Sequence, residues 1–194
     1  MFLLALASAK RVSELQALSC KISFSSSAMV ISYVPEFMVK TESALRPLPR
    51  SFAIQSLSDF AAGLPDDLLL CPVHALSEYL RRTSRLELRP RRLFVSPRCL
   101  SRAMTKNGIS YFFREVIVHS GASSGDNAAP RAHIIRGIAT SSAFFKNWSL
   151  QSVLQAASWR SNTVFTSFYL KDVQYVCEGV RSLGPFVAAG EHIV

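Results

Sequence analysis

Apolar residues make up almost half of this chain, yet they never form a run long enough to cross a membrane. They account for 49% of its 194 residues, whereas a transmembrane helix needs about 18 consecutive apolar residues. Short dispersed runs can be buried only by packing several amphipathic elements against one another. The hydrophobic content excludes a disordered chain, and the length suits one domain with a core. We therefore expect a soluble single domain without a membrane partner.

The first nine residues resemble a secretion signal only in part. Residues 2–7 are apolar and Ala7-Ser8-Ala9 imitates a cleavage site, but no basic residue precedes them. The four cysteines are far apart and form no CxxC pair: Cys20, Cys71, Cys99 and Cys177. This spacing favours neither a zinc site nor a disulfide framework and fits a reducing compartment. We expect an intracellular protein that is not secreted.

The hydrophobic spacing predicts a mainly α fold with a small antiparallel β-sheet, an α+β class. Helices are expected over residues 1–18, 72–82, 105–120, 131–145, 149–157 and 162–170. Strands are expected at 21–24, 29–34 and 37–40. Two prolines make 45–50 an edge strand or an extended link. Beyond residue 171 we expect a tail with a helical turn near 173–180.

The helix predicted over 105–120 is the best defined of these elements. Thr105 caps it, Gly121 ends it, and its buried stripe is expected to comprise Ile109, Phe112, Phe113, Val116 and Ile117. The small polar residues 121–130 then predict an exposed loop. Within that loop GASSG fits the GxSxG pattern of serine hydrolases, but no apolar strand leads into it. We therefore reject a hydrolase.

The charge of the chain points toward phosphate. It carries 22 basic and 13 acidic residues, a net charge of +9, and 16 of the basic residues are arginines. The guanidinium group can bind two phosphate oxygens at once. Half of the arginines lie close together: Arg81, Arg82, Arg85, Arg89, Arg91, Arg92, Arg98 and Arg102. They form either a solvated surface or an electrostatic track for a polyanion.

His133 and Arg136 share one face of a predicted helix, because residues three apart are neighbours on a helix surface. The residues between them, Ile134 and Ile135, are apolar. An imidazole and a guanidinium so placed can hold a phosphate between a proton-transfer group and a cation. The alternative is a surface His–Arg pair at the start of a helix.

Five features in chain order resemble the catalytic series of the tyrosine recombinase (phage-integrase-like) family. They are KRVSEL at 10–15, VKT at 39–41, HIIR at 133–136, Trp159, and the pair Phe168-Tyr169. The segments PEFMVKTES, LCPVHALSEYL, LFVSPR and SLGPFVAAG resemble the recombinases of DIRS-like and Ngaro-type retrotransposons. The resemblance covers essentially the whole chain. It implies a catalytic core over residues 1–171 and a C-terminal tail over 172–194.

The resemblance implies type IB topoisomerase-like DNA strand transfer through a 3′-phosphotyrosine, without ATP, metal or other cofactor. The implied catalytic residues are Arg11, Lys40, His133, Arg136, Trp159 and Tyr169. Arg11 and Arg136 would bind the non-bridging oxygens of the scissile phosphate, where negative charge grows in the transition state. His133 would assist proton transfer at the nucleophile. Glu14, one turn after Arg11, would orient it.

Of the other implied roles, Tyr169 would attack the phosphate, Lys40 would protonate the departing 5′ oxygen, and Trp159 would donate its indole N–H to the phosphate. Trp159 lies ten residues before Tyr169, one more than is usual in the family, so Tyr175 stays an alternative nucleophile. Lys21, in a neighbouring predicted strand, is the alternative to Lys40. We favour Lys40 because a polar turn follows it.

The resemblance also implies partners and a context. Double-stranded DNA is the expected partner, with self-association on DNA during synapsis, in the integration of a mobile element and in the nucleus of a eukaryote. The N-terminal domain that completes the family's DNA clamp is absent from these residues. We therefore expect a fragment of a longer protein or a remnant with weakened binding. A DNA-binding remnant without turnover is the alternative function, and a purely structural interaction protein is the third.

Overall fold

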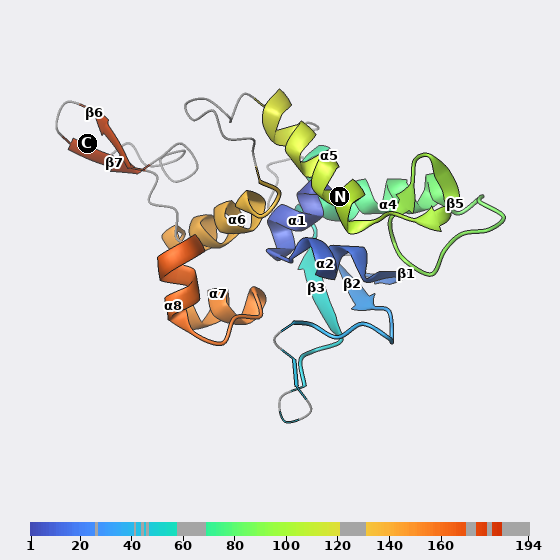
Figure 1. Ribbon diagram of the computed structural model, residues 1–194, viewed down its shortest axis with the longest axis horizontal. Coiled ribbons are helices and arrows are strands. Elements are labelled where there is room, and N and C mark those ends of the chain that lie inside the picture. Colours follow the sequence, from blue (N-terminus) through green and yellow to red (C-terminus); the bar gives the residue numbers. More distant parts are fainter. Residues whose placement is uncertain are drawn as a thin grey trace.

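In the computed structural model of the chain, a small sheet lies beneath short helices, next to the first two of the chain (Figure 1). The structure describes residues 1–25, 27–40, 42–43, 45, 47–57, 69–120, 131–169, 174–177 and 180–183, with the backbone alone from 168 onward. The helices are α1 (Phe2–Ser8), α2 (Val12–Gln16), α4 (Pro72–Thr83), α5 (Lys106–His119), α6 (Ile134–Phe145), α7 (Leu150–Ala156), α8 (Asn162–Val164) and the π-helix η2 (Phe165–Tyr169). The strands are β1 (Leu18–Phe24), β2 (Ala28–Tyr33), β3 (Ser51–Gln55), β4 (Val95–Ser96), β5 (Cys99–Ala103), β6 (Gln174–Cys177) and β7 (Val180–Leu183).

The single helix predicted over 1–18 is wrong, because the chain breaks between α1 and α2. Ala9 adopts a left-handed conformation with φ of 51° and ends α1. Arg11, in extended conformation, then starts α2 as its N-cap residue. Hydrophobic spacing continues across this break, so periodicity alone does not reveal it. The turn places residues 10 and 11 at the surface of the core instead of within a helix.

The sheet confirms the predicted antiparallel arrangement, with order β1-β2-β3. Ile22 pairs with Ile31, and Met29 pairs with Ile54. Met29, Ile31 and Tyr33 alternate along β2 and all three are buried, which gives this central strand one core face.

The strand predicted over 37–40 is wrong, because these residues belong to the connection between β2 and β3. Arg50 holds this connection together. Its guanidinium donates to the carbonyls of Pro35 at 2.8 Å and Phe37 at 2.6 Å, and it lies 3.3 Å from the Glu42 carboxylate. Residues 47–50 are a link and not a strand.

The helices α4 and α5 start where the sequence predicts. Pro72 occupies the first turn of α4, and Leu76 is buried beneath that helix. The Thr105 side chain caps α5 by accepting a hydrogen bond from the Gly108 amide at 3.1 Å.

The buried stripe of α5 is narrower than predicted. Ile109, Phe113 and Ile117 are buried, but Phe112 and Val116 are 38% and 39% exposed. Residues at i, i+4 and i+8 form the face toward the core, and those one position before them lie at its edge. The predicted loop at 121–130 and its GxSxG motif lie outside the described residues.

The C-terminal helices follow the prediction in order, with shifted bounds. The helix predicted from residue 131 begins at Ile134, and His133 is its N-cap residue. Ser149 caps α7 by accepting from the Ser152 amide. The helical turn predicted at 173–180 is wrong, since β6 and β7 pair there as an antiparallel hairpin. The β-branched and aromatic residues of 175–176 have the higher propensity for a strand.

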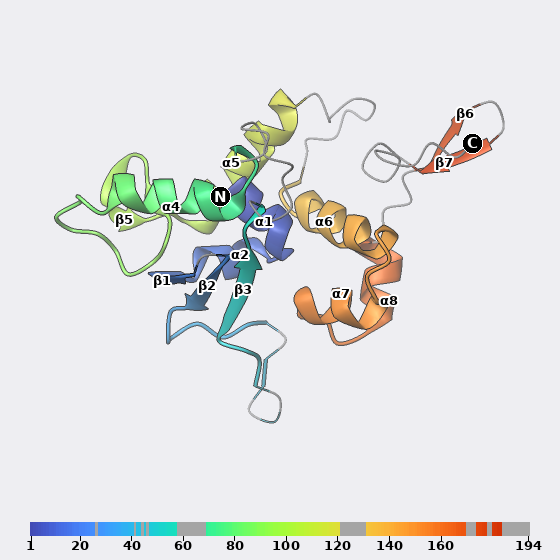
Figure 2. The same cartoon turned by 180° about the vertical axis from the view of Figure 1, so that it is seen from behind.

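Two clusters of buried side chains form the core. The larger joins α1, α2, the sheet, α4 and α5, and it includes Leu15, Ile31 and Phe113. The smaller lies among α6, α7 and η2 around Val153 and Phe165. Figures 1 and 2 show α6–α8 together on one side of α1 and α2, with α4, α5 and β5 on the other. Among the described helices, none is long and apolar enough to span a membrane.

Candidate phosphate-binding site

Glu14 draws three elements together at the boundary of the two clusters. Its side chain is 1% exposed. One carboxylate oxygen accepts from the Arg11 amide at 2.9 Å and lies 3.5 Å from Arg11 Nη1 and 3.3 Å from Arg136 Nη1. The other accepts from the Tyr33 hydroxyl at 3.4 Å. One buried carboxylate therefore positions both arginines that the sequence singled out.

Tyr33 acts in this network as a donor. Burial raises the pKa of Tyr33 well above its usual value, and the adjacent Glu14 carboxylate raises it further. The phenol therefore stays protonated at neutral pH and keeps its hydrogen bond to Glu14. Sequence analysis did not single out Tyr33, because nothing in an alternating strand distinguishes it from a core aromatic residue.

Arg136 also contacts the smaller hydrophobic cluster. Its guanidinium lies 4.5 Å from the centre of the Trp159 ring and donates to the Ala157 carbonyl. The Trp159 ring lies 5.6 Å from that of Phe165, the first residue of η2. With 3% of Arg136 and 8% of Trp159 exposed, this is a buried stack of cation and aromatic rings. The stack holds the orientation of Arg136.

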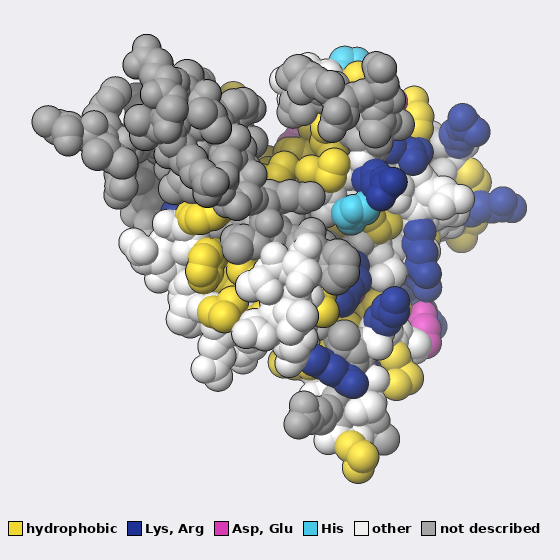
Figure 3. All heavy atoms as spheres, turned by 60° about the vertical axis from the view of Figure 1, so that its left-hand side comes forward, with side chains coloured by type: hydrophobic (Ala, Val, Ile, Leu, Met, Phe, Trp, Pro, Cys, Tyr) yellow, Lys and Arg dark blue, Asp and Glu magenta, His cyan; other side chains and the backbone are white. Residues whose placement is uncertain are grey.

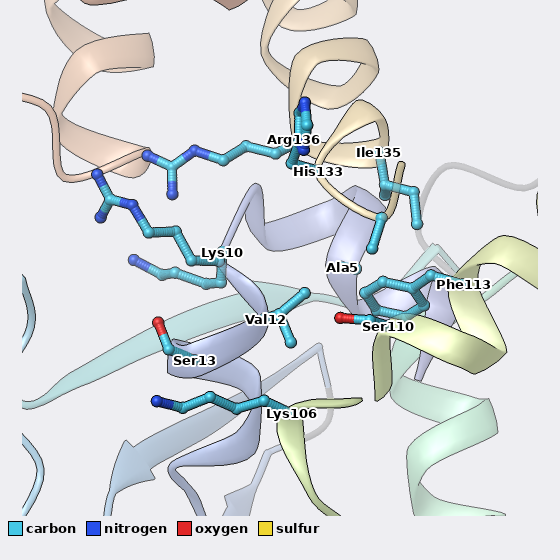
Figure 4. A pocket seen from close by; sticks show the side chains of 12 residues that line it. Ala5, Lys10, Val12, Ser13, Lys106, Ser110, Phe113, His133, Ile135 and Arg136 are labelled. Atoms are coloured by element: carbon cyan, nitrogen blue, oxygen red, sulfur yellow. The ribbon is translucent and has the colours of Figure 1, made fainter. Parts of the chain in front are cut away.

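A cavity of about 380 Å³ opens beside the two arginines. Lys10, Arg11, Lys106, His133 and Arg136 line it, and none of the described lining residues is acidic. Figure 4 shows the side chains of Lys10, Ser13, Lys106 and Arg136 extending toward the same side of this pocket. Such a concentration of donors and positive charge can bind an anion of the size of a phosphate group.

His133 belongs to this cavity, whereas Lys40 does not line it. His133 is exposed at the start of α6, one turn from Arg136. Lys40 is exposed in the β2–β3 connection, directly after the buried Val39. The alternative residue Lys21 is exposed on β1. The described lining of the cavity therefore includes Arg11, His133 and Arg136 but neither Lys40 nor Lys21.

The predicted nucleophile is placed by its backbone only. Tyr169 is the last residue of η2, and η2 packs against α6, the helix that carries Arg136. The side chains of Tyr169 and of the alternative, Tyr175 on β6, lie outside the described residues.

The predicted arginine track is not uniform. Glu78 lies 2.7 Å from both Arg81 and Arg82, and hydrogen bonds from Arg81 and then Arg82 lower the pKa of Glu78 to about 2. Arg89 serves the fold, since it donates to Thr83 and to the Leu93 carbonyl.

The remaining arginines make no ion pair within the described residues. They are Arg85, Arg91, Arg92, Arg98 and Arg102. All but Arg92 are exposed. Figure 3 shows Lys and Arg side chains gathered along one side of the face it presents, where acidic side chains are few.

The solved structures that share the fold of this chain include three of site-specific or related recombinases. An XerA recombinase superposes with a TM-score of 0.58 and 15% identity, over 87% of this chain and 49% of that one. The XerH site-specific recombinase gives a TM-score of 0.58 and 14% identity in two complexes with difH substrates. These are a pre-cleavage complex (85% of this chain, 40% of that one) and a post-cleavage complex with palindromic substrate (87% and 41%).

These similarities confirm the predicted fold class, a mainly α core with a small antiparallel sheet and the fold of tyrosine recombinases. The chain spans half or less of the length of each of these neighbours. No protein-family model matches the sequence, and no curated protein matches it significantly.

Proposed function

We propose that this chain is the catalytic core of a tyrosine recombinase, which cleaves and rejoins DNA strands through a 3′-phosphotyrosine. One observation carries the proposal: Arg11 and Arg136, 125 positions apart in the sequence, share one buried carboxylate and line one cationic cavity with His133. Two fixed guanidinium groups are suited to the non-bridging oxygens of a phosphodiester.

Each group has a defined part in the proposed cleavage. The Tyr169 hydroxyl loses its proton toward His133, and its oxygen forms a bond to phosphorus. The bond from phosphorus to the 5′ oxygen breaks, and Lys40 gives that oxygen a proton. Trp159 holds Arg136 through the stack described above. Because the phosphotyrosine retains the bond energy, rejoining is the same reaction in reverse and consumes no ATP.

The proposed substrate is double-stranded DNA. The XerH neighbours are bound to difH substrate, which supports DNA as the partner, and the arginines without ion pairs supply charge for its backbone. The retrotransposon-like segments of the sequence support a role in the integration of a mobile element. Self-association of copies bound to DNA would bring two duplexes, each with a catalytic site on it, close together.

The test is the trapping of a covalent adduct. A nicked duplex loses the short strand after cleavage, so the protein stays attached to DNA and shifts in a denaturing gel. We expect an adduct with the wild type, none with Tyr169→Phe, and an undiminished amount with Tyr111→Phe, a control at a 53% exposed tyrosine on α5. DNA binding by the wild type without any adduct would favour the DNA-binding remnant instead.

A further inference from the structure

Lys10 belongs to the cationic cavity but has no part in the mechanism above. It lies in the turn between α1 and α2, directly before Arg11. Its ammonium donates to the Ala156 carbonyl at 3.1 Å and lies 4.9 Å from the centre of the Phe52 ring. Contacts to the end of α7 and to β3 thus hold the position of this half-buried side chain.

The ammonium keeps capacity for a ligand. It has three N–H donors, and within the described residues the structure gives it one hydrogen bond, to Ala156. Lys10 lines the cavity together with Arg11 and Arg136, and Figure 4 shows its charged end on the same side as that of Arg136. Two donors therefore remain for an anion in the cavity.

Among the described residues around Glu14, positive side chains outnumber negative ones. Burial lowers the pKa of Lys10; Glu14 opposes this effect, while Arg136 and Arg11 add to it. Lys10, Arg11 and Arg136 stand against one carboxylate, and Lys106 adds a fourth positive charge to the lining of the same cavity.

The negative charge on the phosphate grows during the proposed reaction. A phosphodiester carries one negative charge. When a tyrosine oxygen that has lost its proton adds to phosphorus, the five-coordinate transition state carries two, until the 5′ oxygen leaves and takes a proton. Interactions that strengthen only in the transition state increase the rate of the chemical step.

We propose that Lys10 is a further catalytic residue, which contacts a non-bridging oxygen of the scissile phosphate and balances the second negative charge of the transition state. This inference rests on the proposed function. It predicts that the charge of Lys10 affects the rate of cleavage more than the affinity for DNA.

The test combines variants of Lys10 with two substrates. Lys10→Met keeps the packing on Phe52, Lys10→Gln keeps a donor for the Ala156 carbonyl, and Lys10→Arg keeps the charge. Lys146→Met, on an exposed residue at the end of α6, is the matched control for the loss of one lysine. The substrates are a nicked duplex with an ordinary scissile phosphate and one with a methylphosphonate there, whose transition state carries one charge less.

On the ordinary phosphate we expect both neutral variants to form the adduct about 10²-fold more slowly than the wild type, since one lost donor to a developing oxyanion costs about 10²–10³-fold. Lys10→Arg and Lys146→Met should stay within about threefold of the wild type. On the methylphosphonate the neutral variants should approach the wild-type rate, because the charge that Lys10 balances no longer forms.

Each contrary result has its own meaning. An equal loss on both substrates would show that Lys10 supports the fold only and would overturn the inference, as would no loss on either. A wild type that forms no adduct would overturn the proposed function, and this inference with it. If the wild type forms the adduct and the Lys10 variants form it at the same rate, the inference about Lys10 is refuted and the proposed function stands.

Discussion

Glu14 accepts hydrogen bonds from α2, β2 and α6, and its position decides where both arginines of the site point. Sequence analysis assigned it to Arg11 from their spacing of three residues. Its contact with Arg136, 122 residues away, has no signal in a single sequence. Sequence analysis gave Lys10 no role, because Arg11 alone accounts for the match of KRVSEL to the family's catalytic series.

Removal of the Glu14 carboxylate should destabilise the protein strongly. Glu14→Ala takes from Arg136, 3% exposed, the carboxylate that it contacts, and breaking a buried ion pair costs about 3–5 kcal/mol. Glu14→Gln keeps the size and one acceptor and should lose less. Urea denaturation measures both, with Glu78→Gln, at a partly exposed ion pair on α4, as the control. If Glu14→Ala lost no more stability than that control, Glu14 would not organise the site.

Lys40 can be tested through the leaving group alone. Lys40→Ala should slow cleavage by about 10²–10⁴-fold, the usual contribution of a general acid. A substrate with sulfur at the 5′ bridging position needs no proton on its leaving group, so the variant should cleave it nearly as fast as the wild type. Lys21→Ala, at the alternative residue, is measured in the same way and should cleave both substrates as the wild type does. Equal impairment of Lys40→Ala on both substrates would remove Lys40 from this role.

Helices were predicted well wherever a residue with a known preference for a helix terminus marks where they begin. Pro72 at the start of α4 and the cap residues Thr105 and Ser149 are such residues, and the structure confirms all three helices. The break at Ala9 has no comparable signal. A left-handed alanine is locally unfavourable, and here it lies between α1, which packs on α4 and α6, and α2, which packs on α5. The exposed edge of α5 likewise depends on what packs against it.

The carboxyl group of Glu78 gives a pH test for the arginines of α4. Its pKa of about 2, against an ordinary 4.5, means that the stability it contributes is complete above about pH 4.5 and is lost as the pH falls toward 2. NMR titration should show this carboxyl ionised at pH 4, and Arg81→Gln should raise its pKa. An ordinary titration midpoint would show that Arg81 and Arg82 are not held by Glu78.

The arginines should differ in their effect on DNA binding. Each phosphate contact contributes about −0.9 to the slope of log K against log salt concentration. Arg98→Gln and Arg102→Gln, on exposed residues without ion pairs, should each make the slope shallower by about that amount. Arg89→Gln should lower the stability instead, since Arg89 bonds to Thr83 and Leu93. Identical slopes for all three variants and the wild type would show that these arginines form only a solvated surface and do not contact DNA phosphates.

At the scale of the whole molecule, the site exists only where the two hydrophobic clusters meet. Arg136 contacts Glu14 on one side and the ring of Trp159 on the other. The resemblance to a known family could predict which residues take part, because their order along the chain carries it. It could not predict that Arg136 contacts both Glu14 and Trp159, since these contacts join segments far apart in the sequence.

The central claim is that Arg136 binds a DNA phosphate and that Tyr169 attacks the phosphorus of this phosphate. Its most direct test is to digest the trapped protein–DNA adduct and identify the linked residue by mass spectrometry. We predict a tryptic peptide with Tyr169 joined to a 3′ phosphate. A linkage on Tyr175, a linkage to a 5′ phosphate, or no covalent product from a protein that binds the nicked duplex would contradict the claim.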